Sequence, residues 1–260
     1  PDPDPPTGTT LFGSQLIGAN FDTTFAFETA AGFQMQMVRI FGGSGNNTAL
    51  ASRARNARTH PTQPGFGLGT PVFLSCRFAE DPAITDATLI SYLQTVQGIA
   101  ASYAGAGTEF YLALNPEPDR SDRTYTEAEF RTMHGRITTL AATHAPDVTW
   151  VLNLTGYSFS ARIGDYWPAL SGQFDVLAVD PYWVDGDGQA SEDDMVEVHD
   201  FAATNGLRLA VGEWGVERGK DDSPHANQGA WTGAAVTFLR SFSAPPVEFA
   251  PYFEDNATWD

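Results

Sequence analysis

The sequence predicts an α/β protein that folds as a (β/α)8 TIM barrel. Eight short apolar runs, each bounded by turn residues, alternate with segments of helical periodicity. The runs are continuous rather than alternating, which is typical of parallel strands covered on both faces. The chain of 260 residues also has about the length of one such barrel. A doubly wound sheet is the alternative, although it usually has fewer strands and a glycine-rich first turn.

The expected strands follow one another at regular intervals and are rich in aliphatic, β-branched or aromatic residues. They are LIGANF from Leu16, MVRIF from Met37, PVFLSCRF from Pro71, EFYLAL from Glu109, TWVLNL from Thr149, FDVLAVD from Phe174, LRLAVG from Leu207 and VEFAPYF from Val247. Parallel strands need crossover connections, so the segments between them are expected to be helical.

Helical patterns occur in those connections. Ile90, Leu93 and Val96 follow three-residue spacing, and Thr126 with Glu129 forms a capping-box pattern that predicts a helix start. Residues 191–204 and 227–242 show similar patterns. The chain ends at Asp260, shortly after the eighth strand, so the eighth helix is expected to be missing or to lie outside the chain.

The first fifteen residues are rich in Pro, Thr and Asp, which is typical of a linker or a processed terminus. We therefore predict a linker over 1–15 and a single barrel domain over 16–260. No apolar run is long enough to cross a bilayer. The single cysteine, Cys76, excludes an internal disulfide and is expected to be buried.

The net charge of −18, from 14 basic and 32 acidic residues, argues against a nucleic-acid partner. Strong acidity keeps a secreted or surface-displayed protein soluble and does not repel a neutral polysaccharide. The expected location is therefore outside the cell, or on a cell or virion surface. The protein is expected to be a monomer or one module of a larger chain.

Two glutamates stand where strands end: Glu117 in ALNPEPD and Glu213 in AVGEWGVE. Barrel active sites lie at the C-terminal ends of the strands. A pair of carboxylates there is what cleavage of a glycosidic bond requires, one to transfer a proton and one to attack the sugar or stabilise its cation. The pair therefore predicts a glycoside hydrolase.

Other polar and aromatic residues are expected at the strand ends, where they would bind substrate. They are Arg39, Asn115, Asn153, Asp180, Tyr182, Trp183, Trp214 and Trp259. Trp183 and Trp259 are expected to stack on sugar rings, whereas Trp214 either stacks or packs in the core. Trp150, at the start of its strand, is expected to be structural.

Side-chain alternation assigns faces to two strands. Leu209, Val211 and Glu213 share one face of the seventh strand. Val176, Ala178, Asp180 and Tyr182 share one face of the sixth. Both faces are predicted to line the barrel interior, which would place Glu213 beside Tyr182.

These motifs resemble the retaining (β/α)8 glycoside hydrolases of clan A. An Asn-Pro-Glu-Pro segment ends strand four, Arg39 ends strand two and Tyr182 ends strand six. The segments DVTWVLNLTGY, FDVLAVDPYW and GEWG are most similar to the family 26 type, which includes mannanases and lichenases. The resemblance implies Glu117 as the acid/base and Glu213 as the nucleophile, with Arg39 and Tyr182 hydrogen-bonded to the nucleophile.

The sequence departs from that family at one place. The family has His or Asn immediately before its acid/base, whereas Pro116 separates Asn115 from Glu117 here. The chain is therefore expected to bulge or turn at the end of strand four. Asp119 is the alternative partner for Glu213.

No metal or cofactor is predicted. The five His residues lack paired ligand spacing, and the acidic segment from Asp185 has Val196 where an EF-hand needs Glu. The sequence thus predicts a retaining endo-glycosidase that cleaves a β-mannan-like or β-glucan-like polysaccharide by double displacement. A barrel that binds glycan without cleaving it, as in a cell-wall or phage tail protein, is the alternative.

Overall fold

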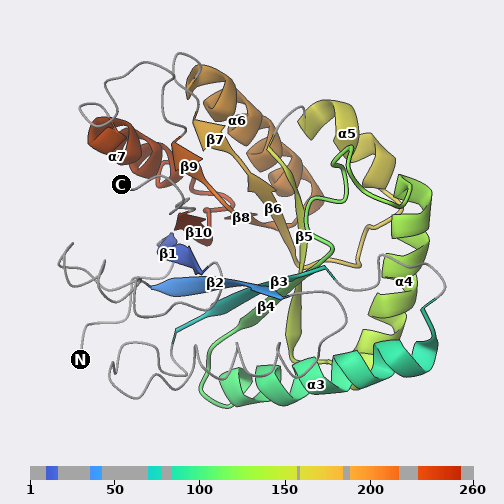
Figure 1. Cartoon of the computed structure of the whole chain (residues 1–260). Coiled ribbons are helices and arrows are strands. Elements are labelled where there is room, and N and C mark those ends of the chain that lie inside the picture. Colours follow the sequence, from blue (N-terminus) through green and yellow to red (C-terminus); the bar gives the residue numbers. More distant parts are fainter. Residues whose placement is uncertain are drawn as a thin grey trace, which may run out of the picture.

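The computed structural model describes residues 10–16, 36–42, 70–77, 84–156, 159–183, 188–216 and 228–252, which form a parallel β-barrel with helices along part of its outside (Figure 1). The strands are β1 Leu11–Leu16, β2 Met37–Gly42, β3 Val72–Cys76, β4 Phe110–Leu114, β5 Val148–Thr155, β6 Val176–Asp180, β8 Arg208–Val211 and β10 Phe249–Tyr252. Their order is β10-β1-β2-β3-β4-β5-β6-β8. A parallel bridge between Leu209 and Val247 joins the two ends of this sheet and closes the barrel. The predicted fold class is confirmed.

The described helices lie outside the strands (Figure 1). They are α3 Asp86–Ala104, α4 Glu127–His144, α5 Phe159–Tyr166, α6 Gly188–Asn205 and α7 Gln228–Leu239. The predicted capping box begins α4, because Thr126 and Glu129 each accept a hydrogen bond from the other's backbone N–H. Beyond β6 and β8, a two-stranded sheet pairs β7 Tyr182–Trp183 with β9 Gly215–Val216.

The first strand begins earlier than predicted. β1 starts at Leu11 and ends at Leu16, so Leu11–Gln15, which the sequence assigned to the linker, belong to the barrel. Gly13 and Ser14 interrupt the apolar run, but parallel pairing with both β10 and β2 keeps this segment extended. The rest of the predicted strand, after Leu16, lies outside the described residues, as do residues 253–260.

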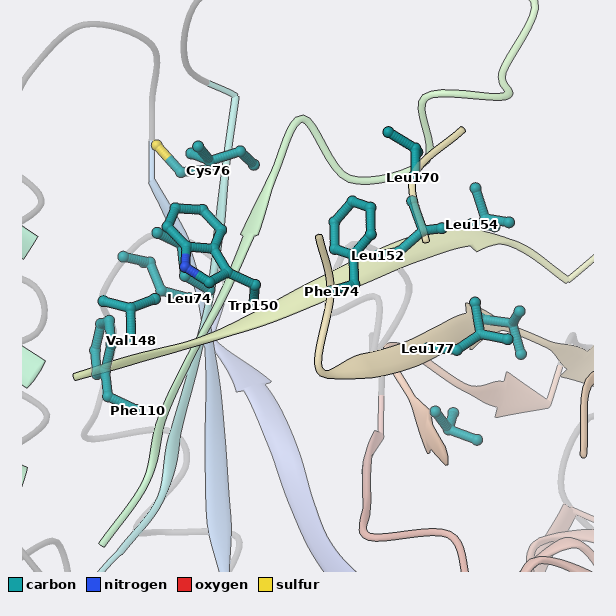
Figure 2. Close-up of a cluster of buried hydrophobic side chains, with 14 of the residues drawn as sticks. Leu74, Cys76, Phe110, Val148, Trp150, Leu152, Leu154, Leu170, Phe174 and Leu177 are labelled. Atoms are coloured by element: carbon teal, nitrogen blue, oxygen red, sulfur yellow. The ribbon is translucent and has the colours of Figure 1, made fainter. Parts of the chain in front are cut away.

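The buried side chains form two layers. The outer layer lies between the strands and the helices and includes Cys76 and Trp150, both buried as predicted. Figure 2 shows part of this layer, with Leu74, Trp150 and Leu177 among its side chains. The inner layer fills the barrel and contains Met37, Phe73, Tyr111, Ala113, Val151, Val176, Ala178, Ala210 and Phe249. Phe249 contacts the rings of Phe73 and Tyr111 from non-neighbouring strands, so these side chains meet inside the barrel.

The predicted inner face is confirmed for β6 and wrong for β8. Val176 and Ala178 belong to the inner layer, and Asp180 continues that face. On β8, however, Ala210 is in the inner layer while Leu209 and Val211 belong to the outer one. The large aliphatic residues of β8 thus pack toward the helices, and the small Ala210 fits the crowded interior.

Candidate active site

Arg39 projects from β2 into the barrel and is 1% exposed. Its Nη1 lies 3.5 Å from Asp180 Oδ1 and 3.3 Å from Glu213 Oε2. Its Nε donates to Ser75 Oγ at 2.9 Å. Arg39 and Ser75 lie on the neighbouring strands β2 and β3, so their hydrogen bond holds the guanidinium in place. Glu213, with which it pairs, follows β8, a strand that is not adjacent to β2 or β3 in the sheet.

Asp180 is the second carboxylate on this arginine, and Asn153 on β5 holds it. Asn153 Nδ2 donates to Asp180 Oδ2 at 3.0 Å, and both side chains are buried. Gly212 completes the arrangement, because a Cβ there would lie 1.7 Å from Asn153 Oδ1 and 2.4 Å from Asp180 Oδ1. The glycine before Glu213 is therefore required by the space that Asn153 and Asp180 occupy.

Asp180 has a pKa well above its usual value. Burial is the main cause; Arg39 opposes it, while the negative charges of Glu213 and Glu117 raise the pKa further and the Asn153 hydrogen bond lowers it. Both glutamates predicted to be catalytic therefore act on the same buried acid. They come from chain segments about a hundred residues apart, which the barrel brings to one end.

Glu117 lies in a turn directly after β4. Asn115 and Glu117 have positive φ angles of 49° and 53°, which is uncommon for residues other than glycine. The Asn115 N–H donates to the Cys76 carbonyl at 2.8 Å, and the Glu117 N–H donates to the Asn153 carbonyl at 2.7 Å. The turn expected from Pro116 is thus present, and it joins Glu117 to the strand that carries Asn153.

Two arginines that the sequence reading missed lie against Glu117. Arg120 Nη1 is 3.1 Å from Glu117 Oε2, and Arg123 Nη2 is 3.8 Å from the same oxygen. Arg123 also donates to the carbonyl oxygens of Pro116 and Glu117. The signal was two basic residues shortly after Glu117 in a chain with only 14, although spacing alone does not reveal such contacts.

Asp119, the alternative partner for Glu213, is engaged elsewhere. Its carboxylate accepts hydrogen bonds from the backbone N–H of Thr155 at 3.0 Å and from the Thr155 hydroxyl. Its carbonyl oxygen accepts from Arg162. Asp119 therefore ties the turn after β4 to the end of β5, and it is 5% exposed.

Of the remaining predicted residues, two are buried and three have side chains outside the described part of the chain. Asn115 is fully buried, with its Nδ2 3.8 Å from Met133 Sδ. Trp214 is 2% exposed, donates from Nε1 to the Ala250 carbonyl at 3.0 Å and meets the Phe12 ring edge-on, which corresponds to packing rather than stacking on sugar. Tyr182 and Trp183 form β7, but their side chains lie outside the described part, as does Trp259.

In the described part of the chain, no group of three or more His, Cys, Asp or Glu side chains could hold a metal ion. None of the helices described combines the length and apolar character that a membrane span needs.

No family model and no curated protein matches the sequence. Solved structures match in fold. An endo-β-1,4-mannanase double mutant from Cellulomonas fimi has a TM-score of 0.65 and 14% identity, over 95% of this chain and 65% of that chain. The catalytic domain of a family 26 endo-β-1,4-mannanase from Bacillus sp. JAMB-750 has a TM-score of 0.65 and 13% identity, over 96% and 78%. The family 26 β-mannanase BoMan26A of Bacteroides ovatus has a TM-score of 0.62 and 14% identity, over 95% and 81%.

These matches extend along nearly the whole chain, although the chain spans only 65% of the length of the Cellulomonas fimi enzyme. TM-scores of 0.62–0.65 show a shared fold, and at identities of 13–14% the likeness extends to the fold alone. The resemblance that the sequence motifs indicated is confirmed at that level. This protein has the (β/α)8 barrel fold of the family 26 endo-β-mannanases.

Proposed function

We propose that this protein is a retaining glycoside hydrolase with Glu213 as nucleophile and Glu117 as acid/base. One observation carries the proposal: Glu117 and Glu213 follow the parallel strands β4 and β8 at the same end of the barrel, where the buried Arg39 pairs with both Asp180 and Glu213. Two carboxyl groups at the C-terminal end of a barrel form the minimum machinery for double displacement.

The chemistry assigns a separate task to each group. Glu213 attacks the anomeric carbon while Glu117 donates a proton to the leaving glycosidic oxygen, which gives a covalent glycosyl-enzyme. Glu117, now ionised, then takes a proton from the water that displaces Glu213 and regenerates both groups. The Arg39 ion pair favours the ionised form of Glu213 that attack requires.

We further propose a neutral β-linked polysaccharide as substrate. The neighbours with the same fold are β-mannanases, and a net charge of −18 would repel an acidic glycan. Endo cleavage of a β-mannan-like or β-glucan-like chain, outside the cell or on a surface, fits these properties. The protein would act as a monomer or as one module of a longer chain.

A glycan-binding barrel without hydrolysis is the second candidate. The pairing of Glu117 with Arg120 at 3.1 Å favours it, because Arg120 then binds the carboxyl group that a general acid has to offer to the leaving oxygen.

The deciding experiment measures reducing-sugar release from mannan, glucan, xylan and bacterial cell-wall polysaccharides. The native protein should release sugar from at least one of them, and Glu213→Gln should reduce that rate by about a thousandfold or more. Glu127→Gln, an exposed change in the first turn of α4, is the matched control and should keep full activity. Release that survives Glu213→Gln contradicts the assigned nucleophile. Binding without release supports the second candidate.

A further inference from the structure

The turn that carries Glu117 is strained, and the strain requires a structural cause. Two non-glycine residues, Asn115 and Glu117, have left-handed φ angles on either side of Pro116. Such conformations are unfavourable and persist only where the surrounding structure holds them, and residues of this kind gather at functional sites. Something beyond local preference therefore keeps this turn in one conformation.

Arg123 supplies much of that restraint. Its side chain is 3% exposed, and its Nε donates to the Glu117 carbonyl oxygen at 2.8 Å. Its Nη2 donates to the Pro116 carbonyl oxygen. One planar guanidinium thus binds the carbonyls of two consecutive residues, a fork that an ammonium group does not reproduce.

Arg120 makes a different kind of contact. Its side chain is 43% exposed and divides its hydrogen bonds between the Glu117 carboxylate and Asp122. Exposed ion pairs of this type contribute little to a fixed geometry. Of the two arginine side chains, the buried guanidinium of Arg123 therefore holds the Glu117 backbone, together with the hydrogen bond from the Glu117 N–H to the Asn153 carbonyl.

We propose, on the basis of the proposed function, that Arg123 is a positioning residue for the acid/base Glu117. Arg123 binds the Pro116 and Glu117 carbonyls and so fixes where the Glu117 carboxyl group meets the leaving oxygen. A general acid must lie within hydrogen-bond reach of the atom that it protonates. A displacement of about 1 Å in such a group reduces the rate by about a hundredfold.

The test compares two substrates that differ in their need for an acid. In a polysaccharide the leaving group is a sugar hydroxyl, which leaves poorly unless its glycosidic oxygen is protonated. The dinitrophenolate of a dinitrophenyl glycoside of the same sugar leaves without protonation. Arg123→Lys keeps the charge but loses the fork, so its kcat/KM on the polysaccharide should fall about 10- to 100-fold. Its kcat/KM on the dinitrophenyl glycoside should change by less than about threefold.

Two variants calibrate this result. Glu117→Gln should show the same substrate pattern with a larger loss on the polysaccharide. Arg136→Lys is the matched control: it alters an arginine in the middle of α4 that pairs with Asp86 at the start of α3, and it should leave both rates unchanged. Equal loss on both substrates in Arg123→Lys, or no loss on either, overturns the proposal.

A crystal structure of Arg123→Lys gives a readout that does not depend on activity. The Glu117 backbone should move by about 1 Å or more from its native position. A turn that stays in place in this variant overturns the positioning role even if the protein proves inactive. Failure of the proposed function has another signature, since the native protein would then cleave neither substrate.

Discussion

An arginine bound by two carboxylates occurs at both ends of this barrel, yet the two clusters differ in almost every physical respect. At the N-terminal end of the strands, Arg208 contacts Glu109 and Glu248. At the C-terminal end, Arg39 contacts Asp180 and Glu213. Each cluster thus combines one arginine with two acidic residues, and the two clusters differ in the geometry of their contacts.

In the Arg208 cluster, the guanidinium binds both carboxylates in full. Arg208 donates to both oxygens of Glu109 and to both oxygens of Glu248, at distances between 2.5 and 2.9 Å. The Tyr111 hydroxyl also donates to Glu109. Burial acts to raise the pKa of Glu109, but the hydrogen bonds from Arg208 and Tyr111 outweigh it and lower that pKa. The Arg208 cluster therefore favours the ionised form of Glu109. It links the residue before β4, the first residue of β8 and the residue before β10.

The Arg39 cluster is buried, and its described ion pairs are longer. One nitrogen, Nη1, serves both carboxylates at 3.3 and 3.5 Å. Asp180 has a raised pKa there, chiefly because it is buried. The exposed Arg208 cluster is thus held by short bidentate bonds, whereas the buried Arg39 cluster shares longer bonds around one nitrogen.

The largest effect should come from removing the buried arginine. Arg39→Met leaves Asp180 and Glu213 without their guanidinium, which should lower the free energy of unfolding by about 3–5 kcal/mol. Activity should fall about a hundredfold or more. Urea denaturation and sugar release measure the two effects. Arg39→Lys, which keeps the charge, should recover most of the stability but little of the activity.

Removing the more exposed arginine, Arg208, should reduce stability by a smaller amount and leave activity nearly unchanged. Arg208 is 37% exposed, so solvent compensates part of its lost bonds, and Arg208→Met should cost about 1–2 kcal/mol in the free energy of unfolding. Activity should stay within about twofold, because the N-terminal end of a barrel serves stability. A greater loss of stability in Arg208→Met than in Arg39→Met contradicts the contrast between the clusters.

The smallest effects concern pH, and their signs should be opposite. With its raised pKa, folded Asp180 keeps a proton that the unfolded chain loses, so its contribution to stability falls as the pH rises above the ordinary Asp value. With its lowered pKa, Glu109 contributes stability above the ordinary Glu value that is lost as the pH falls. Denaturant unfolding between about pH 4 and about pH 8 measures both.

The variants make this comparison direct. Asp180→Asn should gain stability relative to the native protein as the pH rises, since the amide resembles the protonated acid. Glu109→Gln should be less stable than the native protein at neutral pH and approach it as the pH falls. Slopes of the same sign in both variants contradict the assigned protonation states.

Local sequence patterns determined much of this protein. Continuous apolar runs identified β2 to β6, β8 and β10, because strands covered on both faces need no alternation. The capping box of α4 was readable because Thr126 and Glu129 interact within one turn. The positions of Glu117 and Glu213 at strand ends followed from the same runs.

Only the tertiary structure decided what those elements contact. β1 was mislocated because its extended form depends on pairing with β10, more than two hundred residues away in sequence. The inner face of β8 was misread because Ala210, not its larger neighbours, fits the barrel interior. The role of Asp119 and the contacts of Arg123 also depend on a turn with two unusual φ angles.

One physical reason separates the features that the sequence displays from those that only the tertiary structure decides. Hydrophobic periodicity and capping arise between residues a few positions apart, so the sequence displays them directly. Arg39, Asp180 and Glu213 meet because eight strands close into a barrel, and Gly212 leaves room for that meeting. The sequence by itself determined most of the barrel strands and where their carboxylates stand, and barrel closure decided which of those carboxylates share a cation.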